Sequence, residues 1–162
     1  KTKKNEDGNI DKLIEIISSI RSTRSELNVP PKAMVEAFYN DEQIILNSIF
    51  NKYSSALKSI ARIKSIHDFK GGRSEGDIQV IQENETFYLK LLNIIDFKVE
   101  SIRLNKNLSK VSSEIEKIRM KLDSKNFIEN APDDIIKEQK NRLKEYLSSQ
   151  SKIEDAIKSF SS

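Results

Sequence analysis

The chain has 162 residues, of which 33% are charged and 36% hydrophobic, and this composition suits elongated helices in one or two small domains better than one large core. It contains no cysteine, which excludes disulfides and thiolate chemistry, and it has neither an apolar run of about 18 residues nor a signal-peptide core, so we expect a soluble chain. The formal net charge of +3 does not by itself indicate a nucleic-acid partner, so such a partner must be argued from where the charges lie.

A first helix is predicted over residues 10–27, because apolar side chains recur there on one face. These side chains are Ile10, Leu13, Ile14, Ile16, Ile17, Ile20 and Leu27. The polar residues 1–9 are expected to be frayed. Arg21 and Arg24 lie in the last turns, where positive charge suits the negative end of a helix, and Asn28-Val29-Pro30-Pro31 ends the helix.

The following segments are predicted to alternate between strands and helices. A strand at 33–39 precedes a helix at 42–61, for which Asn40-Asp41 offers an N-cap. A second strand is predicted at 63–69, and a loop at 70–76, which holds three of the four glycines. Residues 77–82 and 86–92 flank Glu83-Asn84-Glu85 and predict a hairpin with Asn84 as the turn-tolerant residue. We therefore expect residues 32–95 to form a small mixed α/β unit with a short sheet.

Two long helices are predicted from Asp96 to the C-terminus, because apolar residues alternate there between steps of three and four, as in a coiled coil. The predicted seam consists of Leu104, Leu108, Val111, Ile115, Ile118 and Leu122 in the first arm and Ile136, Gln139, Leu143, Tyr146, Gln150, Ile153, Ile157 and Phe160 in the second. Residues 124–132 are predicted to be a loop at the tip, because a residue before proline is disfavoured in a helix. The arms then run antiparallel, and Gln139 and Gln150 are expected to fix their register. The predicted fold class is α+β, with the small unit followed by a long antiparallel two-helix hairpin over residues 96–162.

No constellation of catalytic or metal-binding residues is evident in the sequence. His67 is the only histidine and has no cysteine to share a metal with. The paired carboxylates lie where helix ends and solvated helix faces explain them. Gly71-Gly72 lacks both the tail of a P-loop and the spacing of a dinucleotide fingerprint. We therefore predict no catalytic residue and no metal site.

Basic residues follow regular rows along both arms. On the first arm, Arg103, Lys110 and Lys117 share one heptad position, and Lys106 and Lys121 adjoin it. The second arm carries Lys137, Lys140 and Lys144 at helical spacing. Such rows are compatible with solvated flanks of a coiled coil or with a rail for RNA phosphates, in which each cation neutralises a backbone charge and displaces counterions.

The tip carries apolar side chains beside a lysine. Phe127 and Ile128 follow Lys125 there. Phe127 either plugs the end of the coiled coil or presents a platform on which an unpaired base or a terminal base pair stacks.

The chain resembles valyl-tRNA synthetases of the bacterial type in three segments that follow the order of that family. The first segment resembles the end of the family's anticodon-binding domain, which closes with an arginine-rich helix end and an Asn-Val-Pro-Pro turn. In this chain it is Arg21-Ser22-Thr23-Arg24-Ser25-Glu26-Leu27-Asn28-Val29-Pro30-Pro31. The entry to its C-terminal coiled coil matches Thr86-Phe87-Tyr88-Leu89 through Ile94-Ile95-Asp96, followed by Glu100 and Arg103-Leu104. The tip and return helix match Lys121-Leu122, Asn126-Phe127-Ile128, Ala131-Pro132 and Ile135-Ile136-Lys137-Glu138. Many members carry a lysine where this tip has Asn130, which weakens the expectation that the tip itself supplies affinity.

The resemblance implies a noncatalytic C-terminal part of a cytoplasmic, ATP-dependent valine–tRNA ligase. Residues 1–31 would be the last helix of the anticodon-binding domain, with Arg21 and Arg24 as its RNA contacts, and residues 96–162 would be an arm that binds the corner of tRNA(Val). ATP and Mg²⁺ would bind upstream of this fragment, which itself would hold no cofactor. The other implied partners are the upstream domains of the same chain, and the protein would be a monomer.

Two further features of the sequence bear on this interpretation. The chain begins at Lys1 and lacks the two catalytic signatures of the family, which favours a fragment of a longer protein. A different class of function also remains open, namely a helical hairpin that contacts proteins, as a chaperone arm does, without any role in nucleic-acid binding.

Overall fold

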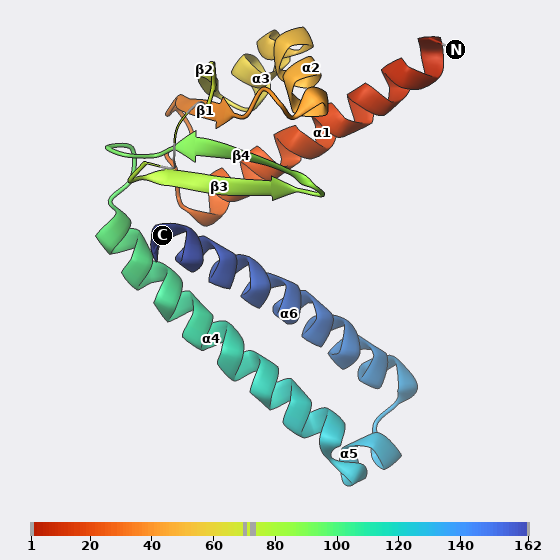
Figure 1. The fold of residues 1–162 in the computed structure, drawn as a ribbon. Coiled ribbons are helices and arrows are strands. Elements are labelled where there is room, and N and C mark those ends of the chain that lie inside the picture. Colours follow the sequence, from red (N-terminus) through yellow and green to blue (C-terminus); the bar gives the residue numbers. More distant parts are fainter. Residues whose placement is uncertain (1, 70, 72–73, 162) are drawn as a thin grey trace. The chain divides into compact units, whose positions relative to one another are not determined.

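The computed structural model describes residues 2–69, 71 and 74–161. It divides into two compact units, one ending at Phe97 and the other beginning at Lys98. Figure 1 shows the elements, which confirm the predicted α+β class. In chain order they are α1 (Thr2–Glu26), β1 (Val35–Tyr39), α2 (Ile44–Lys52), α3 (Ser54–Ile60), β2 (Ile63–Asp68), β3 (Asp77–Gln82), β4 (Glu85–Lys90), α4 (Phe97–Asp123), α5 (Lys125–Asn130) and α6 (Asp133–Ser161). In the part of the chain that the structure describes, no helix combines the length and apolar character needed to cross a membrane.

The first unit is built on a four-stranded sheet with strand order β2-β1-β4-β3. β1 pairs with β2 in parallel, whereas β4 is antiparallel to both β1 and β3. Parallel neighbours need a crossover connection, and α2 and α3 supply it. The β3–β4 hairpin confirms the sequence prediction for residues 77–92.

One face of this sheet carries the core of the first unit. Val35, Ala37 and Tyr39 are buried on β1 and alternate with side chains on the other face, as a strand covered on one side requires. Phe50 of α2 lies against this face, with its ring edge-on to Tyr39 at 4.8 Å and to Phe87 at 5.6 Å between centroids. Such edge-to-face pairs stabilise by about 0.5 to 1.5 kcal/mol beyond the area they bury.

The long first helix differs from its prediction in where it begins and in which side chains it buries. α1 begins at Thr2 and not at residue 10, where the apolar pattern starts. Ile10 and Ile14 are 45% and 56% exposed, although the apolar pattern predicted them on the inner face. Arg24 instead takes a buried place on that face, at 7% exposure. Periodicity counts apolar residues and therefore missed a buried cation.

The predicted helix at 42–61 is divided at Tyr53 into α2 and α3. Tyr53 has φ −113° and ψ 25°, outside helical geometry, and it is followed by Ser54 and Ser55. Serine competes for backbone hydrogen bonds and favours helix starts over helix interiors, so a second helix begins there. The break lets both Phe50 and Leu57 reach the core.

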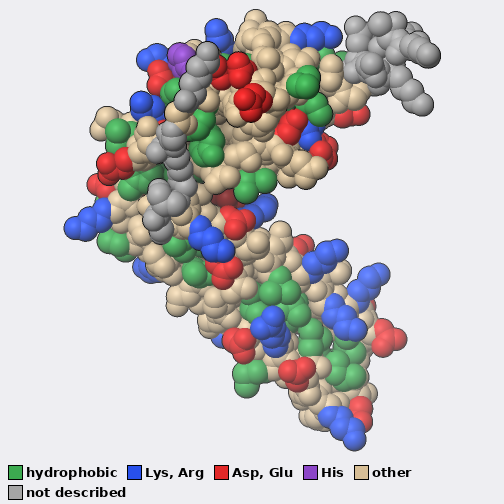
Figure 2. Space-filling model, in the orientation of Figure 1, with side chains coloured by type: hydrophobic (Ala, Val, Ile, Leu, Met, Phe, Trp, Pro, Cys, Tyr) green, Lys and Arg blue, Asp and Glu red, His purple; other side chains and the backbone are tan. Residues whose placement is uncertain are grey.

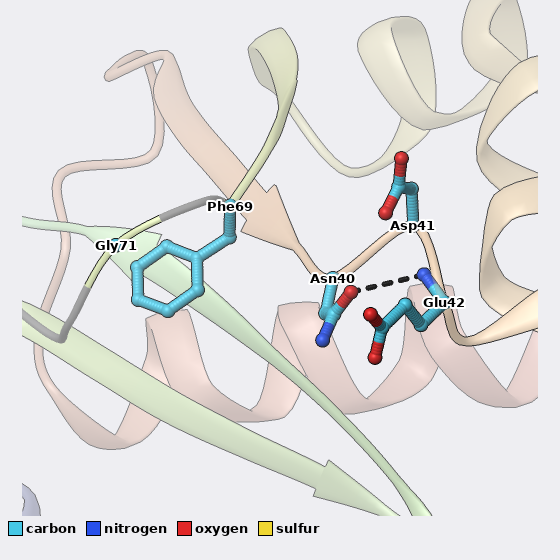
Figure 3. Close-up of a pocket in the computed structure, with 5 residues that line it drawn as sticks. All are labelled: Asn40, Asp41, Glu42, Phe69 and Gly71. Atoms are coloured by element: carbon cyan, nitrogen blue, oxygen red, sulfur yellow. Dashed lines mark hydrogen bonds between the residues drawn. The ribbon is translucent and has the colours of Figure 1, made fainter.

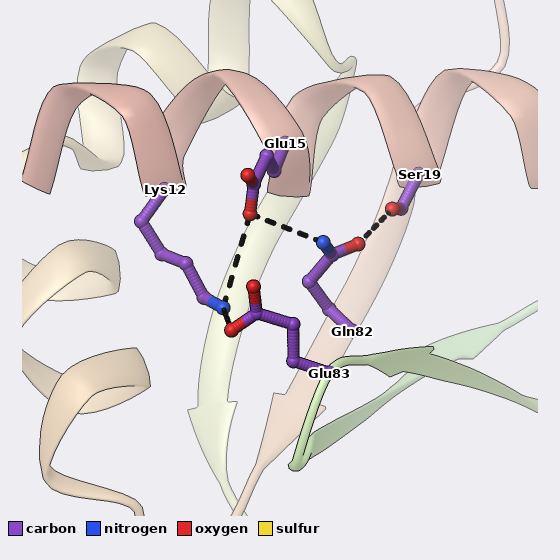
Figure 4. A network of polar contacts seen from close by, with 5 residues as sticks. All are labelled: Lys12, Glu15, Ser19, Gln82 and Glu83. Atoms are coloured by element: carbon purple, nitrogen blue, oxygen red, sulfur yellow. Dashed lines mark hydrogen bonds and ion pairs between the residues drawn. The ribbon is translucent and has the colours of Figure 1, made fainter. Parts of the chain in front are cut away.

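The β3–β4 turn is joined to α1 by polar contacts (Figure 4). Lys12 Nζ lies 2.6 Å from Glu83 Oε2, and Ser19 Oγ donates to Gln82 Oε1 at 2.5 Å. Gln82 Nε2 donates in turn to Glu15 at 3.2 Å. Within the turn, Glu83 adopts the left-handed conformation, with φ 53°. That conformation costs a residue with a Cβ roughly 1 to 3 kcal/mol, and the contacts to α1 help to hold it.

The second unit is an antiparallel helical hairpin. α4 and α6 run side by side in opposite directions with α5 between them at the tip (Figure 1), and Gln150 Nε2 donates to Ser112 Oγ across the pair at 3.1 Å. Every side chain predicted for the seam is buried or half-buried. Gln139 is 8% exposed, and its Oε1 has no hydrogen-bond partner among the described residues. The predicted hairpin is therefore confirmed, with both glutamines at its interface.

The tip differs from the predicted loop because it contains a short helix. Ser124 acts as the N-cap of α5 and accepts a hydrogen bond from Phe127 N at 3.3 Å. Asn130 donates to the carbonyl of Asn126 at 2.8 Å near the end of this helix. Ala131 then takes the extended conformation expected before Pro132, with φ −77° and ψ 143°. The prediction of a break after α4 was right, but it overlooked the serine cap that starts a further turn.

Candidate nucleic-acid interface

The structure places the two basic rows on continuous helices. Arg103, Lys110 and Lys117 are spaced by seven residues along α4 and therefore lie on one side of it. We call them the α4 basic row. Lys137, Lys140 and Lys144 lie within the first half of α6, and we call them the α6 lysine row. On the face visible in Figure 2, Lys and Arg side chains lie beside a strip of hydrophobic side chains on the hairpin.

Two residues of the α4 basic row form ion pairs with carboxylates on the same helix. Arg103 Nε lies 2.6 Å from Glu100, and Lys117 Nζ lies 2.9 Å from Glu114. The hydrogen bond from Lys117 is the main cause that lowers the pKa of Glu114. Lys106 and Lys110 are exposed and form no ion pair with any residue in the described ranges. An RNA phosphate would thus compete with carboxylates at two of the three residues of this row.

The three lysines of the α6 lysine row form no ion pairs with carboxylates among the described residues. Lys137, Lys140 and Lys144 are all exposed, and none of them forms an ion pair within residues 2–69, 71 and 74–161. Between residues 137 and 144 there are four basic side chains, including Arg142, and one carboxylate, Glu138. This is a concentrated positive surface on a helix that is fixed in place by its partner.

The two rows lie on opposite flanks of the hairpin. Lys140 follows the buried Gln139, and Arg119 of α4 follows the buried Ile118. In an antiparallel pair, residues that follow equivalent seam positions share one flank, so Arg119 and the α6 lysine row lie on the same side.

Lys117, by contrast, precedes a seam position, which puts the α4 basic row on the other flank. Glu114 and Arg142 also precede seam positions, Ile115 and Leu143. Arg142 lowers the pKa of Glu114 by charge attraction across the pair, as expected for neighbours on one flank. The flank with the α4 basic row is therefore of mixed charge.

The tip combines a partly buried ring with negative charge. Phe127 is half-buried on α5, and Ile128 is 41% exposed. Lys125 is the only basic residue between 125 and 134, a segment that also holds Glu129, Asp133 and Asp134. Lys125 Nζ lies 3.9 Å from Glu129. This charge makes the tip less suited to phosphates than the flanks are.

The two arginines of the first helix have different environments. Arg21 is exposed, whereas Arg24 is buried and its Nη2 donates to the carbonyls of Pro30 at 3.1 Å and Ala33 at 2.7 Å. Burial, with a smaller contribution from Arg62, lowers the pKa of Arg24. Arg24 thus fixes the turn after α1. Sequence reasoning did not assign this role, because a sequence pattern does not show which side chain donates to a backbone carbonyl.

The described residues offer little for catalysis. They include no group of three or more His, Cys, Asp or Glu side chains able to hold a metal. A shallow depression of about 600 Å³ is lined by Asn40, Asp41, Glu42, Phe69 and Gly71 (Figure 3). Asn40 Oδ1 accepts a hydrogen bond from Glu42 N at 2.9 Å, which is a local turn contact. No nucleophile is paired with a base in this depression.

Comparisons with known proteins point to one family. A family model described as the valyl tRNA synthetase tRNA binding arm matches residues 96–161. A valine–tRNA ligase from Mesorhizobium japonicum is 32% identical over 148 residues, which cover 91% of this chain and 16% of that protein. The valine–tRNA ligase of Bartonella quintana is 34% identical over the same shares, and that of Rhizobium meliloti is 33% identical over 84% of this chain and 14% of its own length. The chain therefore spans less than a fifth of the length of these relatives.

Proposed function

Residues 96–161 belong to the family of valyl-tRNA synthetase tRNA-binding arms, and on this premise we propose that the chain is the noncatalytic, tRNA-binding C-terminal part of a valine–tRNA ligase. Its arm binds the outer corner of tRNA(Val) by shape and phosphate contact and so helps to seat the tRNA for aminoacylation. The reaction itself, with its ATP and Mg²⁺, belongs to domains upstream in the same chain. The parent enzyme acts in the cytoplasm as a monomer.

The observation that carries this proposal is the α6 lysine row. Lys137, Lys140 and Lys144 are exposed, unpaired among the described residues and held on one flank of a fixed helix. Each ammonium that meets a phosphate releases a condensed counterion, and no carboxylate has to be displaced first. We therefore assign the main RNA contact to the flank of the α6 lysine row. Arg119 lies beside this row and is paired with Glu116 at 3.5 Å, so an RNA phosphate would have to compete for it.

The remaining predicted contacts take secondary roles in this proposal. The opposite flank holds Arg103, Lys110, Lys117 and Lys121, and the ion pairs to Glu100 and Glu114 reduce the positive charge that it offers to RNA. Lys106 is two residues from the seam positions on either side and lies on the side of α4 that faces away from α6. At the tip, Phe127 packs as a plug and Lys125 contributes little. In the first unit, Arg21 contacts RNA and Arg24 shapes the turn that follows it.

The alternative of a protein-interaction arm has less support. Exposed apolar residues on the hairpin are spread along it, as Ile102, Met120 and Leu147 illustrate. Single exposed apolar residues are ordinary on soluble proteins and do not define a docking patch.

The proposal is tested by the salt dependence of tRNA binding. We compare the parent chain with the triple variant Lys137→Ala, Lys140→Ala, Lys144→Ala, using fluorescence anisotropy with labelled tRNA at several salt concentrations. The slope of log affinity against log salt should flatten by about 2 to 3, because each lost phosphate contact removes close to one counterion.

The control variant removes the same charge elsewhere, through Lys32→Ala, Lys58→Ala and Lys152→Ala, all at exposed positions. It should leave the slope nearly unchanged. Equal flattening in both variants would mean that only net charge matters, and an unchanged slope in the first variant would remove the α6 lysine row from the interface.

A further inference from the structure

The outer face of the four-stranded sheet carries a row of aromatic side chains. α1 and α2 pack on the opposite face, through Gln82 and Phe87. On the outer face, the strand register places Phe38 directly beside His67 on β2 and Tyr88 on β4, and Tyr88 beside Gln79 on β3. Side chains of all four strands therefore form one continuous row.

The rings of this row lie nearly parallel to their neighbours. Phe38 and His67 stack at 5.2 Å between centroids with 27° between planes, and Tyr88 stacks with Phe69, just past β2, at 5.1 Å and 26°. The three six-membered rings are half-buried and His67 is exposed. Solvent thus reaches part of every ring, and the rings support one another in fixed orientations.

The groups around the rings are polar. Lys90 Nζ lies 5.9 Å from the centroid of Phe38 and forms no ion pair with a residue that the structure describes. Gln79 and Thr86 lie on the same face and offer hydrogen-bonding groups, and Ser65 Oγ is hydrogen-bonded to His67 Nε2 at 2.8 Å. Two carboxylates share this face, Glu36 and Asp77, and the strand register places both beside Lys90. Asp77 is buried and accepts a hydrogen bond from Ser74 N at 2.8 Å.

We propose that this outer face, which we call the ring face, binds unpaired nucleotides of an RNA strand by stacking their bases on Phe38, Tyr88 and Phe69. Flat rings backed by other rings suit bases, because every base has a π-face and stacking tolerates any sequence. Lys90 contacts the phosphate that links two stacked nucleotides. A face for docking proteins would be richer in aliphatic groups, but Ile81, at 66% exposure, is the one aliphatic side chain among the described strand residues of this face.

The ring face lies in the unit that precedes the arm, so this site goes beyond the proposed function of the arm. The choice of RNA as its ligand rests on that proposed function. The arm acts on phosphates of a folded RNA, whereas the ring face takes bases that are free of pairing. The two surfaces are therefore distinguished by their ligands as well as by their residues.

The test uses the whole chain and a fluorescein-labelled single-stranded RNA hexamer of adenosines, with affinity measured by anisotropy. Phe38→Val and Tyr88→Val keep β-forming side chains but remove a ring, and each should weaken hexamer binding about tenfold. The matched control Ile81→Thr removes apolar area from the same face without removing a ring, and it should bind as the parent chain does. Equal loss in all three variants, or no loss in the two ring variants, overturns the proposal.

A second measurement does not depend on the stability of variants. A hexamer with one photoreactive 4-thiouridine should crosslink to peptides that contain Phe38, Tyr88 or Phe69, and crosslinks confined to the hairpin would overturn the ring face. The triple lysine variant described above should retain hexamer binding while losing tRNA affinity. Failure of the arm proposal and failure of the ring face therefore give different results.

Discussion

The two units of the chain contain the same number of basic residues but use them differently. Residues 1–97 and residues 98–162 each hold 14 Lys and Arg, whereas the first segment has 14 Asp and Glu and the second has 11. The whole formal charge of +3 therefore belongs to the hairpin. In the first unit, cations serve the fold, as Arg24 and Lys12 do, while on α6 they stand exposed along a flank. Charge sign alone does not identify an RNA contact, but charge without a partner does favour one.

The units also differ in how deeply they bury side chains. Phe50, Phe87 and Leu46 are at most 2% exposed in a core covered from several directions. In the hairpin, most seam positions are only half-buried, because two helices cover each other on one side only. The first unit can thus hold rings in fixed positions, and the hairpin presents long, accessible flanks.

The largest effect is expected from a change in the deeper core. Phe87→Ala should lower the free energy of unfolding of the first unit by about 3 to 5 kcal/mol, because it removes a fully buried ring and leaves a cavity beside Phe50. Ile118→Ala in the hairpin should cost about 2 kcal/mol, near the lower end for such changes, because its surroundings can collapse or admit water. Urea unfolding followed by circular dichroism measures both. Equal losses would contradict the difference in depth between the two units.

An intermediate effect is expected at the arginines of α1. Arg24→Met should destabilise the chain by about 2 to 3 kcal/mol, because it leaves the carbonyls of Pro30 and Ala33 without their charged donor. Arg21→Met changes an exposed residue and should alter stability by less than about 0.5 kcal/mol. Thermal melts and tRNA affinity are measured on both variants. A stable Arg24→Met variant with weakened tRNA binding would make Arg24 an RNA contact and break the distinction between the units.

The sequence predicted the hairpin well because its information is local and repeated. The spacing of Leu104, Ile115 and Ile118 by itself predicts a helix–helix seam. The Ala131-Pro132 step predicts that the first arm ends before it. The arrangement of the sheet was harder to predict from the sequence, because it depends on strand order. Both the parallel pairing of β1 with β2 and the row formed by Phe38, Tyr88 and His67 follow from that order. No periodicity within one strand encodes that order.

The basic rows show the same limit at the candidate site. Their members were identified by helical spacing, but which of them form ion pairs depends on side-chain conformations. Lys117 is paired with Glu114, whereas Lys110 forms no ion pair with a residue that the structure describes. The flanks on which the rows lie follow only from the pairing of α4 with α6. Arg24 likewise looked like a surface cation because sequence patterns do not reveal the buried carbonyls that it binds.

The smallest effect is expected at Lys12, which joins α1 to the β3–β4 turn. Its hydrogen bond to Glu83 raises its pKa above the ordinary 10.5, with smaller contributions of the same sign from charge attraction by Glu83, Glu85 and Glu15, while burial acts in the opposite direction. A group whose pKa is raised by folding contributes stability that is fully present below its unfolded pKa and is lost as pH rises through the folded value. The contribution of Lys12 should therefore be constant from pH 7 to about 10 and then decline.

Lys12→Met isolates this contribution from the other groups that titrate at high pH. Because Glu83 is well exposed, the variant should lose less than about 1 kcal/mol at pH 7. The difference in unfolding free energy between the two proteins should shrink above pH 10.5, as Lys12 of the parent chain loses its charge. A difference that stays constant through this range would mean that Lys12 stabilises the contact between α1 and the turn through the packing of its methylene chain and not through its charge.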